Sequence, residues 1–89
     1  MASTLHDPRY QKLVELLVAA RKDAGLTQDA LGALLGRPQS YLGKIETLQR
    51  RLDALELFDL LAAMELDVRS FAVEAEATLG PRPRARRRR

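Results

Sequence analysis

The chain has 89 residues and a net charge of +3, and 46% of its residues are hydrophobic although only 4% are aromatic, so we expect one helical core of Leu, Ala, Val and Ile. It has no cysteine, so a disulfide framework is excluded, and its single histidine, His6, cannot form a metal site alone. No cofactor is expected. Because no apolar run reaches the roughly 18 residues of a membrane span and the first residues lack a signal pattern, a soluble cytoplasmic protein is predicted.

The first predicted helix follows a short segment, residues 1–6, that we expect to be flexible. Asp7 and Pro8 have the form of an N-cap followed by proline at the first helical position. Gly25 supplies a left-handed stop at the other end. Between these signals apolar side chains recur at helical spacing, at Tyr10, Leu13, Val14, Leu17 and Ala20.

Two short helices joined by a tight turn are predicted next. Thr27 is suited to cap the first, and Gly36 is suited to the turn because glycine adopts a positive φ without steric cost. Pro38 fits the first position of the other short helix, which is the third helix of the chain. A small residue is needed where the two helices cross steeply, and Gly32 provides it. The inward positions are Ala30, Leu31, Leu34 and Leu35 in the second helix of the chain, and Leu42 and Ile45 in the third.

Two longer helices complete the predicted domain, residues 7–80. Asp53 and Glu56 have the spacing of a capping box, and Asp67 is suited to cap the last helix. The apolar stripes are Leu57, Leu60, Leu61 and Met64, and then Val68, Phe71, Ala72, Ala75 and Leu79. Residues 81–89, PRPRARRRR, have no apolar content with which to fold, so a disordered arginine-rich tail is predicted.

Charge is distributed unevenly along the chain. Residues 1–80 hold nine Lys/Arg and twelve Asp/Glu, whereas the tail holds six arginines. Within the domain, the stretch 37–51 has four basic residues against one acid, and the stretch 53–76 has seven acids against one arginine. One part of the domain is therefore suited to face a polyanion while another repels it.

The small residue, the turn glycine and the aliphatic residues between Gln28 and Ile45 occur at fixed spacing. The sequence AGLTQDALGALLGRPQSYLGKIE at 24–46 resembles the Cro/repressor helix-turn-helix family of bacterial and phage regulators, also called the xenobiotic-response-element type, and the resemblance extends over about residues 10–76. It implies an all-α, compact, five-helix domain like that of lambda repressor. It also implies a regulator of transcription, most often a repressor, that binds double-stranded DNA at the nucleoid.

The resemblance also implies roles for individual residues. In this family the glutamine that opens the second helix, here Gln28, contacts a phosphate. An arginine late in the first helix commonly pairs with the glutamate that ends the third, which here are Arg21 and Glu46. The first turns of the third helix enter the major groove, which nominates Arg37, Gln39, Ser40, Tyr41 and Lys44. Arg50 and Arg51 follow that helix and could meet phosphates, or only be solvated.

The chain departs from the family pattern at two places. Many members have a glycine shortly after the glutamate, where this chain has Thr47 and Leu48, so the path of residues 47–52 is left open. Where this chain has Gly32, alanine is more common in the family. We expect the glycine to cost the helix about 0.5–1 kcal/mol relative to alanine.

A homodimer on a pseudo-palindromic operator is the leading interpretation, because one helix covers only a few base pairs. Phe71 and Leu79 are the candidate dimer surface, although their stripe could equally complete the core. The alternative is an antitoxin or adaptor whose helical body binds a protein partner while the tail binds nucleic acid without specificity. No nucleophile–base pair is apparent, so an enzyme is not expected.

Overall fold

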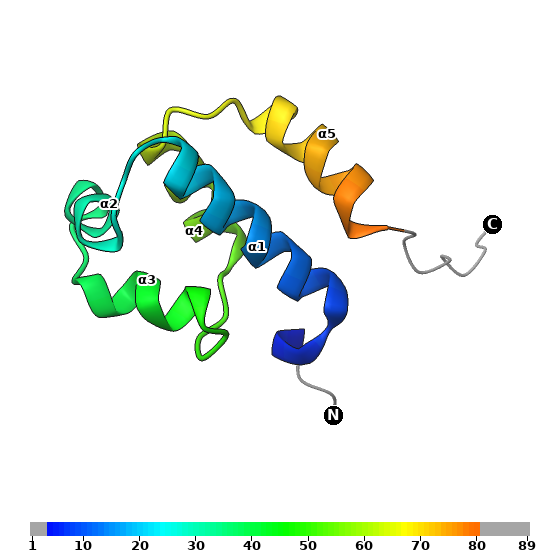
Figure 1. The fold of residues 1–89 in the computed structure, drawn as a ribbon, viewed down its shortest axis with the longest axis horizontal. Helices are drawn as coiled ribbons and strands as arrows, with labels where there is room; N and C mark the ends of the chain where they lie inside the picture. Colours follow the sequence, from blue (N-terminus) through cyan, green and yellow to red (C-terminus); the bar gives the residue numbers. More distant parts are fainter. Residues whose placement is uncertain (1–3, 81–89) are drawn as a thin grey trace.

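The computed structural model describes residues 4–80, which form helices separated by short turns (Figure 1). The elements are a 3-10 turn at Thr4–His6 and the helices α1 (Pro8–Asp23), α2 (Gln28–Leu35), α3 (Gln39–Glu46), α4 (Ala54–Ala63) and α5 (Val68–Leu79). The 3-10 turn lies within the segment that was expected to be flexible. Residues 81–89, the predicted tail, lie outside the described part of the chain. The predicted all-α, five-helix class is confirmed.

Side-chain caps begin four of the five helices. Asp7, Thr27 and Asp67 each accept a hydrogen bond from a backbone N–H in the first turn of α1, α2 and α5, respectively. Asp53 and Glu56 form both hydrogen bonds of a capping box at the start of α4. Each cap satisfies a donor that the helix leaves unpaired, which is worth about 1 kcal/mol. The cap residues identified in the sequence therefore set these boundaries.

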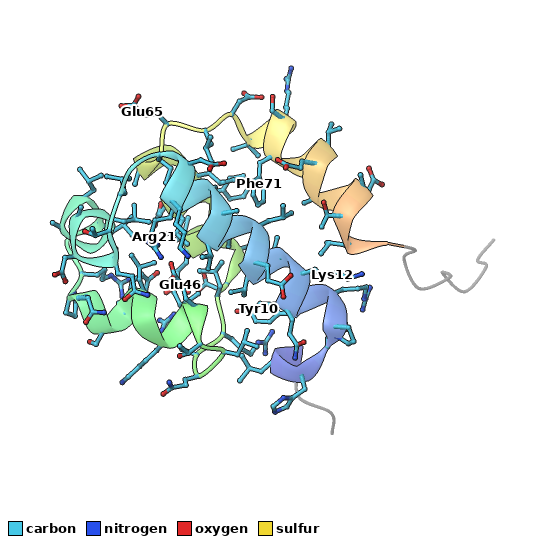
Figure 2. All side chains as sticks on the ribbon, in the orientation of Figure 1. Tyr10, Lys12, Arg21, Glu46, Glu65 and Phe71 are labelled. Atoms are coloured by element: carbon cyan, nitrogen blue, oxygen red, sulfur yellow. The ribbon has the colours of Figure 1, made fainter. Side chains whose placement is uncertain are left out.

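The core is shared by all five helices. In Figure 1, α5 runs beside α1, and α1 also packs against α3, while α2 contacts both α3 and α4. Figure 2 shows Phe71 between α1 and α5, and its side chain is 8% exposed. The buried residues that form the central cluster are Leu17, Leu31, Tyr41, Leu42, Ile45, Leu60, Leu61, Met64, Phe71 and Ala75. None of the helices described in residues 4–80 is long and apolar enough to cross a membrane.

Three details of the short helices differ from the prediction. Pro38 does not occupy the first helical position, because its backbone is extended (ψ 161°) and it is the N-cap of α3, which begins at Gln39. Ala30 and Leu34 are exposed rather than inward, Leu34 by 61%. Around the helix axis, the buried side of α2 extends from Leu31 past Leu35 to Gly32. Leu34 lies next to Leu31 but on the side away from Leu35, outside this buried side.

The turn between α2 and α3 is possible because two glycines serve different purposes. Gly36 has a φ of +68°, which an L-residue adopts only at a cost. Gly32 instead provides space, since a Cβ at this position would lie 2.9 Å from the carbonyl oxygen of Arg37. The backbone after α2 thus packs directly on the helix, and α3 begins close to it.

The segment after α3 ends the helix with a leucine in a left-handed conformation. Leu48 has a φ of +64°, a conformation that normally favours glycine. The Gln49 N–H donates to the carbonyl of Lys44 at 2.8 Å, which closes the end of the helix. The Leu52 N–H donates to the Tyr10 hydroxyl at 3.0 Å. These contacts define the path of residues 47–52, which the sequence had left open.

Candidate nucleic-acid interface

A buried ion pair joins the end of α1 to the end of α3. The Glu46 carboxylate accepts hydrogen bonds from Arg21 Nε at 2.7 Å and Nη2 at 3.0 Å (Figure 2). Arg21 Nη1 donates to the Leu26 carbonyl at 2.8 Å, which also holds the turn before α2. The two side chains are only 10% and 12% exposed. A bidentate pair of this kind fixes the orientation of α3 relative to α1.

Two glutamines extend this ion pair to the surface. Gln28 Nε2 donates to Glu46 Oε1 at 2.8 Å, and Gln28 Oε1 accepts a hydrogen bond from Gln39 Nε2. Gln28 is half-buried, whereas Gln39, the first residue of α3, is exposed. A continuous chain of hydrogen bonds therefore runs from Arg21 to Gln39. It fixes the direction of an exposed side-chain amide on α3.

Other exposed cationic and polar side chains lie on α3 and in the segments before and after it. Ser40 and Lys44 are exposed on α3, and Arg37 and Arg51 are exposed before and after it. Among residues 4–80, no ion pair engages Arg37, Lys44 or Arg51. Their charges are therefore available to an anionic ligand.

Tyr41 has a different environment from the other predicted contacts. Its side chain is 8% exposed, and the guanidinium carbons of Arg37 and Arg50 lie 4.6 and 4.9 Å from its ring centroid. Both distances are within the range of a cation–π contact. Burial and the nearby carboxylate of Glu56 raise the pKa of Tyr41, so its hydroxyl is neutral at physiological pH.

Arg50 is paired within the chain. Its Nη1 and Nη2 donate to the two carboxylate oxygens of Glu56 at 3.0 and 2.8 Å, and Nη1 also donates to the Arg51 carbonyl at 3.0 Å. The hydrogen bonds from Arg50, together with the backbone N–H of Asp53, lower the pKa of Glu56 to about 2. The sequence identified Glu56 only as a cap, and its spacing from Arg50 gave no sign of this second role.

The two predicted dimer residues lie at an apolar groove between α1, α4 and α5. Phe71 is buried and Leu79 is half-buried, so neither projects freely from α5. Phe58 and Val68, on the same groove, are 50% and 39% exposed. The groove has a volume of about 440 Å³ and is lined by Leu13, Leu57, Phe58, Leu61, Val68, Phe71, Ala72, Ala75, Glu76, Leu79 and Gly80. An apolar surface of this kind is suited to a protein partner.

Comparisons with known proteins agree with this geometry. A model of the helix-turn-helix family matches residues 17–71, which include α2 and α3 and their contacts with α1 and α4. Among solved structures, the chain is similar to an XRE-family like protein from Pseudomonas syringae pv. tomato, with 44% sequence identity and a TM-score of 0.76. The alignment covers 83% of this chain and 90% of that one. No curated protein matches the chain.

Proposed function

The chain belongs to the XRE-type helix-turn-helix family of DNA-binding transcription regulators, and on that basis we propose that it is a repressor that reads an operator with α3 in the major groove. The observation that carries this proposal is the hydrogen-bonded chain from Arg21 through Glu46 and Gln28 to Gln39. It holds an exposed amide at the start of α3, where a helix of this type meets base edges.

The two glutamines retain the atoms that DNA contacts require. Gln39 uses one amide N–H on Gln28 and keeps its second N–H and its Oε1, the pair that adenine N7 and N6 would engage. Gln28 keeps one N–H for a phosphate oxygen. Ser40 and Lys44 are proposed to contact base edges, and Arg37 and Arg51 the phosphates.

We further propose that two copies bind together, related by a two-fold axis, with the groove of α4 and α5 as the shared surface. A second copy presents the same apolar side chains, so the exposed ring of Phe58 in each copy can enter the groove of the other. Phe71 is then the floor of the groove and Leu79 part of its wall. Two copies of α3 would read half-sites about one helical turn apart.

Residues 81–89 are proposed to add phosphate contacts without reading bases. Six arginines in nine residues provide positive charge that can neutralise phosphates. Such a segment raises affinity for any duplex. Its removal should flatten the dependence of log affinity on log salt concentration by several units, since each phosphate contact contributes about 0.9.

Selection of duplexes from a random pool tests the proposal, with the full chain and with a chain truncated after Gly80. We expect both to select one pseudo-palindromic sequence, and the truncated chain to bind it with a flatter salt dependence. If the full chain selects no sequence, specific reading by α3 is wrong. If truncation abolishes all DNA binding, the adaptor alternative is favoured, with the tail as the nucleic-acid-binding part.

A further inference from the structure

Two arginines, Arg37 and Arg50, flank α3 in the sequence. Arg37 precedes the helix and Arg50 follows it, yet their guanidinium groups meet at one side chain, the ring of Tyr41. Because Tyr41 is 8% exposed and belongs to the core cluster, the ring is a fixed platform rather than a mobile surface group. The side chains from the two ends of α3 are therefore coupled through a residue of its first turn.

The two guanidinium groups differ in what balances their charge. Arg50 forms two hydrogen bonds to Glu56, whose side chain is 12% exposed. The positive charge of Arg50 is therefore largely neutralised within the protein. Arg37 is exposed and has no ion pair in residues 4–80. An approaching phosphate therefore meets a net positive charge at Arg37 and a neutral pair at Arg50 and Glu56.

We propose that Tyr41 is a positioning residue that presents Arg37 to a DNA phosphate, and that the pair Arg50–Glu56 braces the Tyr41 ring without contacting DNA. This inference rests on the proposed function. A guanidinium stacked on a fixed ring has fewer conformations to lose when it binds, so affinity increases although no contact is added. In this arrangement a single phosphate contact depends on four side chains.

Salt dependence distinguishes a phosphate contact from a brace. Arg37→Gln should reduce the magnitude of the log–log salt slope on the selected duplex by about 0.9. The double variant Arg50→Gln/Glu56→Gln removes the brace with no change in net charge. It should leave the slope unchanged and weaken binding about two- to fivefold, the range of an exposed cation–π contact. Arg69→Gln, an exposed cation on α5, is the control for loss of a remote positive charge.

A double-mutant cycle separates positioning from loss of folded structure. If the brace acts through Arg37, the two- to fivefold loss should disappear when the double variant is made in the Arg37→Gln background. Tyr41→Leu should weaken binding in the same dependent way, and Tyr41→Phe, which keeps the ring, should restore most of it. Circular dichroism melting identifies any variant that is unfolded at the binding temperature, and for that variant the cycle is run at a lower temperature.

Three outcomes would overturn the inference. A slope reduced by about 0.9 in the double variant would make Arg50 a phosphate contact itself. An equal loss of affinity in both backgrounds would mean that the brace is only structural. An Arg37→Gln slope equal to that of the parent would remove Arg37 from the phosphates. In each case the parent still binds its selected duplex, so the proposed function survives, whereas a parent that selects no duplex overturns both.

Discussion

Gly32 lies in a helix, where glycine is normally unfavourable, because the turn after α2 leaves no room for a side chain. Gly32→Ala would gain about 0.5–1 kcal/mol in helix propensity but would bring a Cβ to 2.9 Å from the Arg37 carbonyl oxygen. Since overpacking costs about 1–3 kcal/mol, we expect the free energy of unfolding to fall by about 1 kcal/mol. Urea denaturation measures this change.

Gly43 in α3 provides a matched control for that variant. A Cβ there would meet only ordinary contacts, with Gln39 Nε2 at 3.5 Å and Gln28 Oε1 at 3.7 Å. Gly43→Ala should therefore gain about 0.5–1 kcal/mol in the same experiment. An equal gain in both variants would show that the backbone of Arg37 does not constrain Gly32.

Glu56 makes stability depend on pH in the acid range. Its pKa is about 2 in the folded chain against 4.5 for a free side chain, so its stabilising contribution is complete above pH 4.5 and is lost as the pH falls toward 2. Arg50 is 38% exposed and therefore screened by solvent, so we expect a contribution of about 1–2 kcal/mol.

The variant Glu56→Gln isolates this effect. Its free energy of unfolding, measured by urea denaturation at several pH values, should decline less than that of the parent between pH 4.5 and 2. The two curves should therefore converge as the pH falls. Parallel curves would mean that Arg50 does not hold this carboxylate in its ionised form.

The pair Arg21–Glu46 determines how α3 is oriented relative to α1. Because both side chains are nearly buried, removing one leaves the other charge without its partner. We expect Glu46→Ala and Arg21→Ala each to lower the free energy of unfolding by about 3–5 kcal/mol. Differential scanning calorimetry would show this as a large fall in Tm.

Arg9 and Asp7 form the corresponding control, a pair in which the arginine is 41% exposed. Arg9→Ala should lower the free energy of unfolding far less than Glu46→Ala does, since solvent screens such exposed pairs. If Glu46→Ala cost no more than Arg9→Ala, the buried pair would have no special role in orienting α3.

Element boundaries were predictable where a single side chain determines them. Asp7, Thr27, Asp53 and Asp67 cap the helices that the sequence assigned to them. The exposure of Leu34 was not predictable, because it depends on which flank of α2 packs on the following turn. Likewise, the left-handed conformation of Leu48 has no local signal, since leucine adopts it only when the surrounding structure compensates.

In the candidate site, the pairing of Arg21 with Glu46 was predictable from the family resemblance, whereas the other contacts were not. The family resemblance nominated Arg21, Gln28, Gln39 and Glu46, which lie in one hydrogen-bonded chain. The pairing of Arg50 with Glu56 could not be read from the sequence. It depends on the path of residues 47–52, and that path is fixed by contacts with a distant helix, such as the Tyr10 hydroxyl.

Two surfaces of the molecule have different chemistry, and a different partner is proposed for each. The basic residues around α3 are suited to DNA, and the apolar groove of α4 and α5 to a second copy. Phe58→Lys should place a charge in that groove and shift a dimer to monomer in sedimentation velocity. Since Phe58 is 50% exposed, folding should change little.

Loss of the dimer should also be visible in DNA binding. Affinity for a palindromic duplex should fall, while affinity for a duplex of random sequence should change little, because only the palindrome engages both copies at once. Dimerisation unaffected by Phe58→Lys would remove the groove as the dimer surface. The proposal that α3 reads DNA would not depend on that result.

Whether α3 reads bases is tested by the ratio of two affinities, one for the selected duplex and one for a scrambled duplex. This ratio is measured for the parent and for Gln39→Ala. Gln39 is exposed, so its loss should leave the fold intact. We expect the variant to lose about 1–3 kcal/mol of binding to the selected duplex and little binding to the scrambled one, so the ratio should fall by about tenfold or more. An unchanged ratio would contradict base reading by the first residue of α3.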